Sequence, residues 1–329
     1  MAQPVLYPPT QLSPAAALAL SQRAPTILRS SPSTVSSSPF SALFAGSEKS
    51  ELWLQYENLI LSCLRTGDEN AARQCLQRLV ARFGEDNERV QALSGLVKEA
   101  EAKSNSALEG ILKEYDQILS ESDTNIPIVK RRIALLRSMG RVSDATSALV
   151  QLLEFSPTDA EAWSELSDIY LSQGLYPQAI YAMEEVLVLA PNAWNIHARL
   201  GELQYMAATA PGVAHGSYQK YMAEAIKRFS RSIELCDDYL RGYYGLKLVS
   251  KKLLSDGAKA TKLPEDGEVS FPDTKTIERL NELATAKLVE IVRHSTAHDR
   301  GWRGYSQAEI AAAQELLSED ESAASGIKR

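Results

Sequence analysis

The sequence of 329 residues has few of the residue types on which metal centres, disulfide frameworks and membrane spans depend. Its three cysteines, Cys63, Cys75 and Cys236, are an odd number at no metal-ligand spacing. None of its asparagines has serine or threonine two places on, so it offers no acceptor for N-glycosylation. Uninterrupted apolar runs, such as residues 15–20, are far shorter than the ~20 residues of a membrane helix. We therefore expect reduced thiols, the cytosolic side of the cell and no direct membrane span.

The charge balance disfavours two further classes of partner. The chain has 35 lysines and arginines against 42 acidic residues, a net charge of −7 and a pI near 5.4. Electrostatic binding to nucleic acid or to an anionic membrane surface goes with an excess or a cluster of basic residues. We expect no nucleic-acid partner. Apolar residues at 44% and charged residues at 23% are typical of a well-packed soluble protein.

Catalytic and cofactor motifs are also missing. The chain has four histidines, and only His294 and His298 stand four apart, a spacing that could place both on one face of a helix. No third ligand lies between them and no acidic residue follows His294, as a zinc protease would need, so a solvated helix C-terminus is favoured. No nucleophile motif or glycine-rich phosphate loop occurs. We expect no catalytic residue, no metal and no cofactor, and no enzyme activity.

What the sequence does contain is a repeat of 34 residues. One helix-turn-helix signature is formed by Trp163, Leu166, Tyr170, Gly174, Ala179, Met183 and Pro191. Its landmarks recur one period earlier at Val129, Gly140, Ala145 and Pro157. This is the period of the tetratricopeptide repeat, with Ser167 where glycine is usual. The pattern predicts an all-α solenoid of antiparallel helix pairs that stack to close a shared core and present a concave groove.

Helical periodicity divides the chain into five parts. We expect a Pro/Ser-rich arm (1–49), the solenoid (50–254), a linker (255–274), a C-terminal helical cap (275–318) and a disordered tail (319–329). The helix pairs of the solenoid are predicted at 51–65 with 68–82, 88–103 with 107–120, 126–138 with 143–155, and 160–172 with 177–189. A fifth pair, 194–206 with 218–236, is interrupted by a long turn, and 239–254 adds one more helix.

The arm is unusual in composition. Residues 1–47 contain no aspartate or glutamate, seven prolines and a serine-rich stretch at 30–38. An acid-poor, serine-rich segment is also typical of a mitochondrial transit peptide, which remains an alternative. Only Arg23 and Arg29 are positive, however, and the prolines interrupt an amphipathic helix. We expect an extended arm, with a short helix at 14–22, lying along the solenoid or a partner.

In a tetratricopeptide stack the first helix of each pair lines the concave surface. Projecting the register onto these helices predicts partner-binding residues at Lys130, Arg137, Asp168, Glu202, Tyr205, Tyr244 and Lys251. The alternative that these are solvated charges and packing tyrosines stays open. The predicted core of the repeats consists of Trp163, Leu166, Tyr170, Ala179, Pro191 and Phe229. A chaperone-type clamp, in which lysine, asparagine and arginine bind the carboxylate of a peptide C-terminus, is not expected. Lys130 stands at a clamp-like position, but Ala134 stands where asparagine is needed and Glu165 where a cation or an amide is needed.

Several segments, in their order along residues 51–254, resemble subunit two of the endoplasmic reticulum membrane protein complex. They are LWLQYE (52–57), CLQ (75–77) with RF (82–83), YDQIL (115–119), KRRIA (130–134), EAW (161–163) with EL (165–166), EE (184–185) with PN (191–192), GELQY (201–205) and GYYGL (242–246). The arm, the connection at 104–106 and the linker depart from this family core.

The resemblance implies a non-catalytic scaffold, peripheral to the cytosolic face of the endoplasmic reticulum membrane. Its partners would be the other subunits of that complex, bound through their cytosolic segments, and the complex inserts tail-anchored and multipass proteins. Tyrosines and cations of the groove would bind, while Trp163 and Trp194 would pack. Two alternatives are a general cytosolic tetratricopeptide adaptor or cochaperone and a mitochondrial tetratricopeptide protein.

Overall fold

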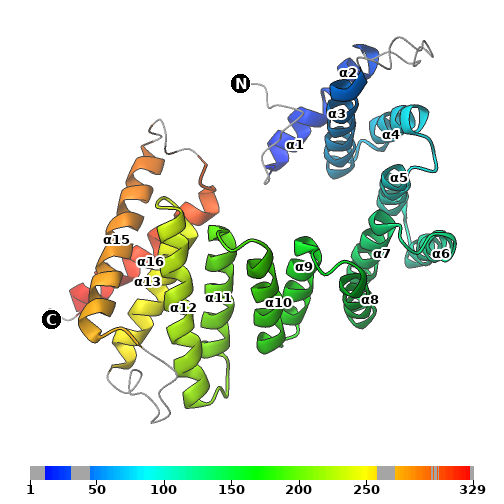
Figure 1. The fold of residues 1–329 in the computed structure, drawn as a ribbon. Coiled ribbons are helices and arrows are strands. Elements are labelled where there is room, and N and C mark those ends of the chain that lie inside the picture. Colours follow the sequence, from blue (N-terminus) through cyan, green and yellow to red (C-terminus); the bar gives the residue numbers. More distant parts are fainter. Residues whose placement is uncertain are drawn as a thin grey trace. The chain divides into compact units, whose positions relative to one another are not determined.

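The structure, a computed structural model, describes residues 12–30, 45–257, 271–297, 299, 302 and 304–326 (Figure 1). Every regular element in these residues is an α-helix, which confirms the predicted fold class. The chain divides into two compact units, Met1–Gln151 and Leu152–Arg329, and each is described by itself. Within the described ranges no helix is both long and apolar enough to cross a membrane.

The N-terminal unit contains the helices α1 (Pro14–Ser21), α2 (Ala24–Ser30), α3 (Ala45–Arg65), α4 (Glu69–Phe83), α5 (Glu88–Glu101), α6 (Asn105–Glu121), α7 (Ile126–Ser138) and most of α8 (Val142–Phe155). Several of these helices begin after a residue whose side chain caps the first turn by accepting a hydrogen bond from a backbone amide. Asp68 accepts from the Ala71 amide at 3.0 Å, and Ser104 accepts from the Ala107 amide at 3.3 Å. The buried Asn125 caps α7 and donates to Gln91 of α5 at 2.8 Å, which ties neighbouring repeats together.

The short helix predicted at 14–22 is confirmed as α1 (Pro14–Ser21), whereas the extended chain predicted after it is wrong, because residues 24–30 form α2. The buried side chains Leu20, Ala24 and Leu28 of α1 and α2 share a core with Trp53 and Tyr56 of α3. Ser13 caps α1 and Pro14 occupies its first turn, so an alanine- and leucine-rich segment can start a helix there. Helix α3 also begins earlier than expected, at Ala45. The expectations for residues 1–11 and 31–44 lie outside the described residues.

The C-terminal unit consists of the end of α8 and the helices α9 (Ala160–Ser172), α10 (Tyr176–Leu189), α11 (Trp194–Thr209), α12 (His215–Leu235), α13 (Leu240–Asp256), α15 (Thr274–Thr296) and α16 (Gln307–Gly326). In Figure 1 the antiparallel pairs α9/α10 and α11/α12 follow one another side by side. The interruption of the fifth pair is shorter than predicted, because α11 continues to Thr209 and α12 starts at His215. Gly212, with φ of 77°, makes the turn between them.

The repeat core contains most, but not all, of the residues assigned to it. Leu166, Ala179 and Phe229 are buried, while Trp163 and Tyr170 are half-buried. Two assignments are corrected. Pro191 is exposed, because it stands in the turn after α10, where its ring limits the backbone and fills no core space. Trp194 is 44% exposed at the first position of α11, so it is not a packing residue in this unit.

Ser167, which stands where the repeat usually has glycine, lies fully buried between α9 and α10. Its hydroxyl donates to the carbonyl of Ala179 at 2.7 Å. A buried hydroxyl is tolerated only when it is hydrogen-bonded, and this bond satisfies it. The departure from the repeat pattern is therefore accommodated within the same helix pair.

The last helices of the unit are joined by a buried polar network. Lys247 of α13 is 1% exposed, and its Nζ donates to Asn281 at 3.3 Å and to Thr285 at 2.7 Å, both on α15. Helix α16 runs on to Gly326, past Ser318, so the expected disordered tail is helical over 319–326; alanine and glutamate, which favour helix, are frequent there. Residues 258–270 of the predicted linker lie outside the described residues.

Candidate partner-binding pocket

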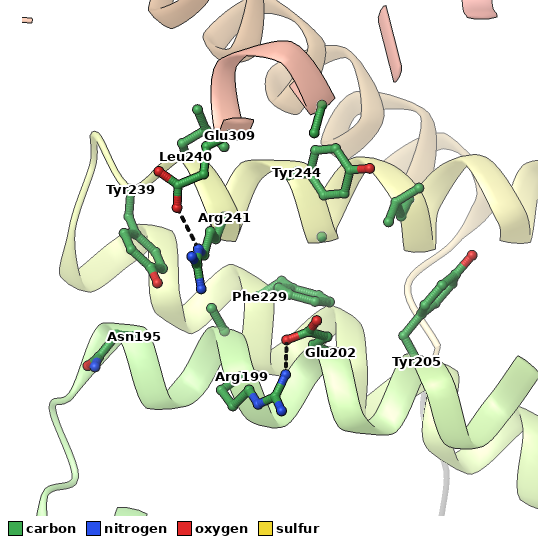
Figure 2. A pocket seen from close by; sticks show the side chains of 14 residues that line it. Asn195, Arg199, Glu202, Tyr205, Phe229, Tyr239, Leu240, Arg241, Tyr244 and Glu309 are labelled. Atoms are coloured by element: carbon green, nitrogen blue, oxygen red, sulfur yellow. Dashed lines mark hydrogen bonds and ion pairs between the residues drawn. The ribbon is translucent and has the colours of Figure 1, made fainter. Parts of the chain in front are cut away.

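A pocket of about 290 Å³ opens between α11, α13 and the first turns of α16 (Figure 2). α11 is the first helix of the fifth pair, and α13 is the further first-type helix that the repeat pattern predicted. The pocket is lined by Asn195, Ala198, Arg199, Glu202, Tyr205, Phe229, Tyr239, Leu240, Arg241, Tyr244, Gly245, Leu248, Glu309 and Ala312. Its lining therefore combines aromatic rings with charged groups of both signs.

Phe229 of α12 lies behind the pocket, with only 3% of its surface exposed. Two glycines on opposite helices let the backbones approach its ring. A Cβ atom at Gly201 of α11 would lie 3.1 Å from the ring, and one at Gly245 of α13 would lie 2.0 Å from it. The absence of side chains at these two positions allows α11 and α13 to close over the ring.

Three half-buried tyrosines, Tyr205, Tyr239 and Tyr244, form the aromatic part of the pocket. Burial raises the pKa of each phenol above its ordinary value, and this is the largest effect on all three. The hydroxyl groups therefore stay protonated at neutral pH and can donate hydrogen bonds. Figure 2 shows Tyr239 toward the Asn195 end of the pocket and Tyr205 at the opposite end.

Ion pairs join the helices that line the pocket to their neighbours, α11 to α9 and α13 to α16. Arg199 of α11 donates through Nη1 to Glu202 at 2.7 Å and through Nη2 to Asp168 of α9 at 3.0 Å. Arg241 of α13 donates through Nε to Glu309 of α16 at 2.7 Å. Each exposed pair adds little stability, but together they fix charged groups on four helices in one arrangement.

Glu309 holds the start of α16 in place. Its Oε2 accepts from the Ser306 amide at 3.0 Å, and the Ser306 hydroxyl accepts from the Glu309 amide at 3.1 Å, which is a capping box. Burial alone would raise the pKa of the Glu309 carboxyl, but the hydrogen bonds from Ser306 and Arg241 outweigh it and lower that pKa. At neutral pH the carboxylate is therefore ionised, with one oxygen directed to α16 and the other to α13.

Comparisons with known proteins identify the family. A family model described as the EMC2 TPR-like repeat domain matches residues 80–220. The TPR repeat protein oca3 of Schizosaccharomyces pombe is 32% identical over 247 residues, which cover 74% of this chain and 83% of that protein. The ER membrane protein complex subunit 2-A of Xenopus laevis is 30% identical over 216 residues, which cover 66% of this chain and 68% of that protein. The chain belongs to the ER membrane protein complex subunit 2 family.

The resemblance to subunit 2 that was inferred from the sequence is thus confirmed. The predicted tetratricopeptide-repeat fold is confirmed with it. A solved structure also matches, that of the C-terminal part of a TPR repeat-containing protein from Cytophaga hutchinsonii. It is 13% identical, with a TM-score of 0.46, and the match covers 91% of this chain and 99% of that one.

In this member of the subunit 2 family, the predicted groove residues do not all come together. Glu202, Tyr205 and Tyr244 line the pocket, and Asp168 reaches it through its ion pair with Arg199. Lys251 lies farther along α13 and pairs with Glu319 of α16 at 3.1 Å. The other two predicted residues lie on α7 of the N-terminal unit, where Lys130 is half-buried and Arg137 is exposed.

The sequence reasoning missed Arg199, Tyr239, Arg241 and Glu309. Arg241 and Glu309 are 68 residues apart, and the 34-residue register ends before α16, so periodicity could not bring them together. One local signal was available: Ser306 followed three residues later by Glu309 is the sequence pattern of a capping box. It marks the start of α16, although it does not reveal the contact with α13.

The described residues contain no group of three or more histidines, cysteines, aspartates or glutamates that could hold a metal ion. His294 instead bonds Asp299 through Nδ1 at 2.7 Å and stacks on Trp302, while His298 lies outside the described residues. Burial raises the pKa of the Cys63 thiol to about 11 and that of Cys75 to about 12. Both are thus poor nucleophiles, because the thiolate is the reactive form.

Proposed function

We propose that the chain is a non-catalytic scaffold subunit of an endoplasmic reticulum membrane protein complex, peripheral to the cytosolic face of the membrane. Its first-type helices bind cytosolic segments of the membrane subunits and hold them in place for the insertion of tail-anchored and multipass proteins. The observation that carries the proposal is membership of the subunit 2 family, whose Xenopus laevis member is named as a subunit of that complex.

The pocket supports a binding role for the C-terminal unit. A recognition site needs apolar surface for affinity and a few fixed polar groups for specificity. Leu248 and the tyrosines provide the first, while Arg199 and Arg241 provide the second. The ion pairs of Arg199 with α9 and of Arg241 with α16 keep these groups in position before a partner arrives, which lowers the entropy cost of binding.

The alternative of a general cytosolic adaptor or cochaperone lacks the site that would support it. A carboxylate clamp needs a set of cationic and amide side chains on neighbouring first-type helices. At the positions that follow Lys130 in this register the chain has Ala134 and Glu165. A glutamate in such a site would repel a peptide carboxylate.

The test is affinity capture of the tagged endogenous protein from gently solubilised membranes, followed by mass spectrometry. We expect a stoichiometric set of endoplasmic reticulum membrane subunits. Recovery of cytosolic chaperones instead, or of mitochondrial proteins together with a shortened N-terminus, would overturn the proposal.

A pocket variant extends the same experiment. Glu202→Arg reverses a charge on α11 and places a third guanidinium near Arg199 and Arg241, so we expect it to reduce recovery of the membrane subunits severalfold. Glu234→Arg is the matched control, because Glu234 is exposed on α12, pairs with Arg231 and does not line the pocket. Equal losses in both variants would show that the pocket is not the binding surface.

A further inference from the structure

Among the groups of the pocket that have no hydrogen-bond partner in the described part of the chain, donors outnumber acceptors. Arg241 bonds Glu309 through Nε, and no residue that the structure describes accepts from its two Nη groups. In Figure 2 this guanidinium extends from α13 toward α11. The hydroxyls of Tyr205, Tyr239 and Tyr244 likewise bond no described residue. A ligand that enters the pocket therefore meets several donors that can still form bonds.

The acidic groups of the pocket, by contrast, are already engaged. Glu309 uses both oxygens, one on Arg241 and one on Ser306. Glu202 accepts from Arg199 through Oε2. A cationic ligand would have to break these pairs, whereas a ligand rich in acceptors would add to them. The two Nη groups of an arginine also match the two oxygens of a carboxylate in spacing and direction.

The dimensions favour an extended chain. Asn195 and Tyr205 mark the two ends of the pocket on α11 (Figure 2), and ten residues of helix span about 15 Å. An extended peptide rises about 3.3 Å per residue, so four or five residues cross the pocket. Side chains two positions apart in such a peptide point to the same side. One of them can face Arg241 while the other lies on the partly exposed apolar surface of Tyr244 and Leu248.

We propose that this pocket binds an extended acidic segment of a partner subunit, with a side-chain carboxylate on the guanidinium of Arg241 and an apolar side chain, two positions away, over Tyr244 and Leu248. The tyrosine hydroxyls donate to the carbonyl groups of the segment. The inference rests on the proposed function, since a partner subunit supplies the segment.

The test is a fluorescence anisotropy titration of the full chain with nine-residue synthetic peptides, acetylated and amidated at their ends. The probe carries leucine two positions before a central aspartate in a glycine and serine background. Companion peptides have asparagine or lysine in place of the aspartate, and a fourth has asparagine there and a free C-terminal carboxylate. We expect the aspartate peptide to bind at least tenfold more tightly than each of the other three.

Variants assign the preference to the pocket. Arg241→Gln should remove the discrimination between aspartate and asparagine. Arg231→Gln should leave it intact, because Arg231 is an exposed arginine of α12 that pairs with Glu234 outside the pocket. Arg241→Lys keeps the charge beside Glu309 but loses the two-pronged geometry, so it should retain only part of the preference.

A second set of variants leaves the ion pair with Glu309 untouched. Changing Tyr205, Tyr239 and Tyr244 together to phenylalanine keeps the rings and removes the three hydroxyls, so the aspartate peptide should bind severalfold more weakly. Tyr181→Phe, which removes an exposed hydroxyl on α10, should have no effect. Hydrogen exchange of the α16 amides in each variant tests whether α16 remains folded.

Three results would overturn the inference: equal binding of the aspartate and asparagine peptides, preference for the lysine peptide or the free C-terminus, or discrimination that survives Arg241→Gln. The proposed function is judged separately. If the wild-type chain captures the membrane subunits but does not distinguish the peptides, the pocket inference fails and the scaffold proposal stands. If it distinguishes the peptides but captures no membrane subunit, the scaffold proposal fails.

Discussion

The close approach of Gly245 to the Phe229 ring makes a quantitative prediction. A Cβ atom at Gly245 would lie 2.0, 2.2 and 2.6 Å from three ring carbons, and the ring is too deeply buried to swing away. Overpacking a core costs about 1–3 kcal/mol, and contacts this short belong at the upper end. Alanine in a helix interior recovers about 1 kcal/mol relative to glycine. Gly245→Ala should therefore lower the free energy of unfolding by about 2 kcal/mol.

The matched control is Gly216→Ala in the same unit. A Cβ atom there would meet no atom of the described residues within 4 Å, so only the helix propensity changes. We expect this variant to be neutral or stabilised by up to about 1 kcal/mol. Native-state hydrogen exchange of the α11, α12 and α13 amides measures both effects locally, without requiring the two units to unfold together.

A double-mutant cycle assigns the cost to the ring. Phe229→Leu removes Cε1 and Cζ, the two ring atoms closest to the new Cβ, so Gly245→Ala should be less harmful in that background, with an interaction energy of at least about 1 kcal/mol. If Gly245→Ala is as stable as Gly216→Ala, or if its cost is unchanged by Phe229→Leu, the packing of α11 and α13 around this ring is incorrect.

Three further predictions concern single side chains. Trp163→Ala should cost about 2 kcal/mol, below the range for a fully buried tryptophan, because its ring is only half-buried against the core that includes Ala179 and Met183, with an edge contact to Tyr181 and a hydrogen bond to the Pro157 carbonyl. An unchanged melting temperature would contradict the register. Burial lowers the pKa of His197, so the unfolded chain binds a proton more readily and stability should fall as the pH drops below about 6.5. In thermal melts across that range, the melting temperature of His197→Gln should depend less steeply on pH than that of the wild type. An identical dependence would refute the prediction. Iodoacetamide at neutral pH should modify Cys236 first, and the buried Cys63 and Cys75 only after denaturation, as peptide mapping would reveal; early labelling of either buried thiol would contradict their environment.

The sequence predicted best those parts of the fold in which the 34-residue repeat is regular. Around Ser167 the 34-residue period fixed α9 and α10 within one residue, because each landmark has a packing reason to recur. Helix α2 was not predicted, and α1 only as a short helix in an extended arm, because the signal for their packing is not local. A short helix is marginal alone, and here Leu20 and Leu28 gain their stability from α3 and α4, which no local pattern announces.

The pocket shows the same division. Glu202, Tyr205 and Tyr244 were predicted because they lie on helices whose inner face the register defines. Arg241 was not, since its orientation depends on Glu309, beyond the linker and outside the repeat. A periodic pattern predicts which face of a helix is inward, but a contact between a repeat and a non-repeating helix has to be observed.

The buried ammonium of Lys247 has a consequence for synthesis on the ribosome. Its bonding partners Asn281 and Thr285 follow 34 and 38 residues later, so at about 5–20 residues per second they are made roughly 2–8 seconds after it. During that interval Leu246, Val249 and Leu253 of α13 are already made but have no α15 to pack against. A chain released with its end in the linker has no α15 and exposes this face, so chaperones that bind apolar helices should crosslink to it and not to the full-length chain.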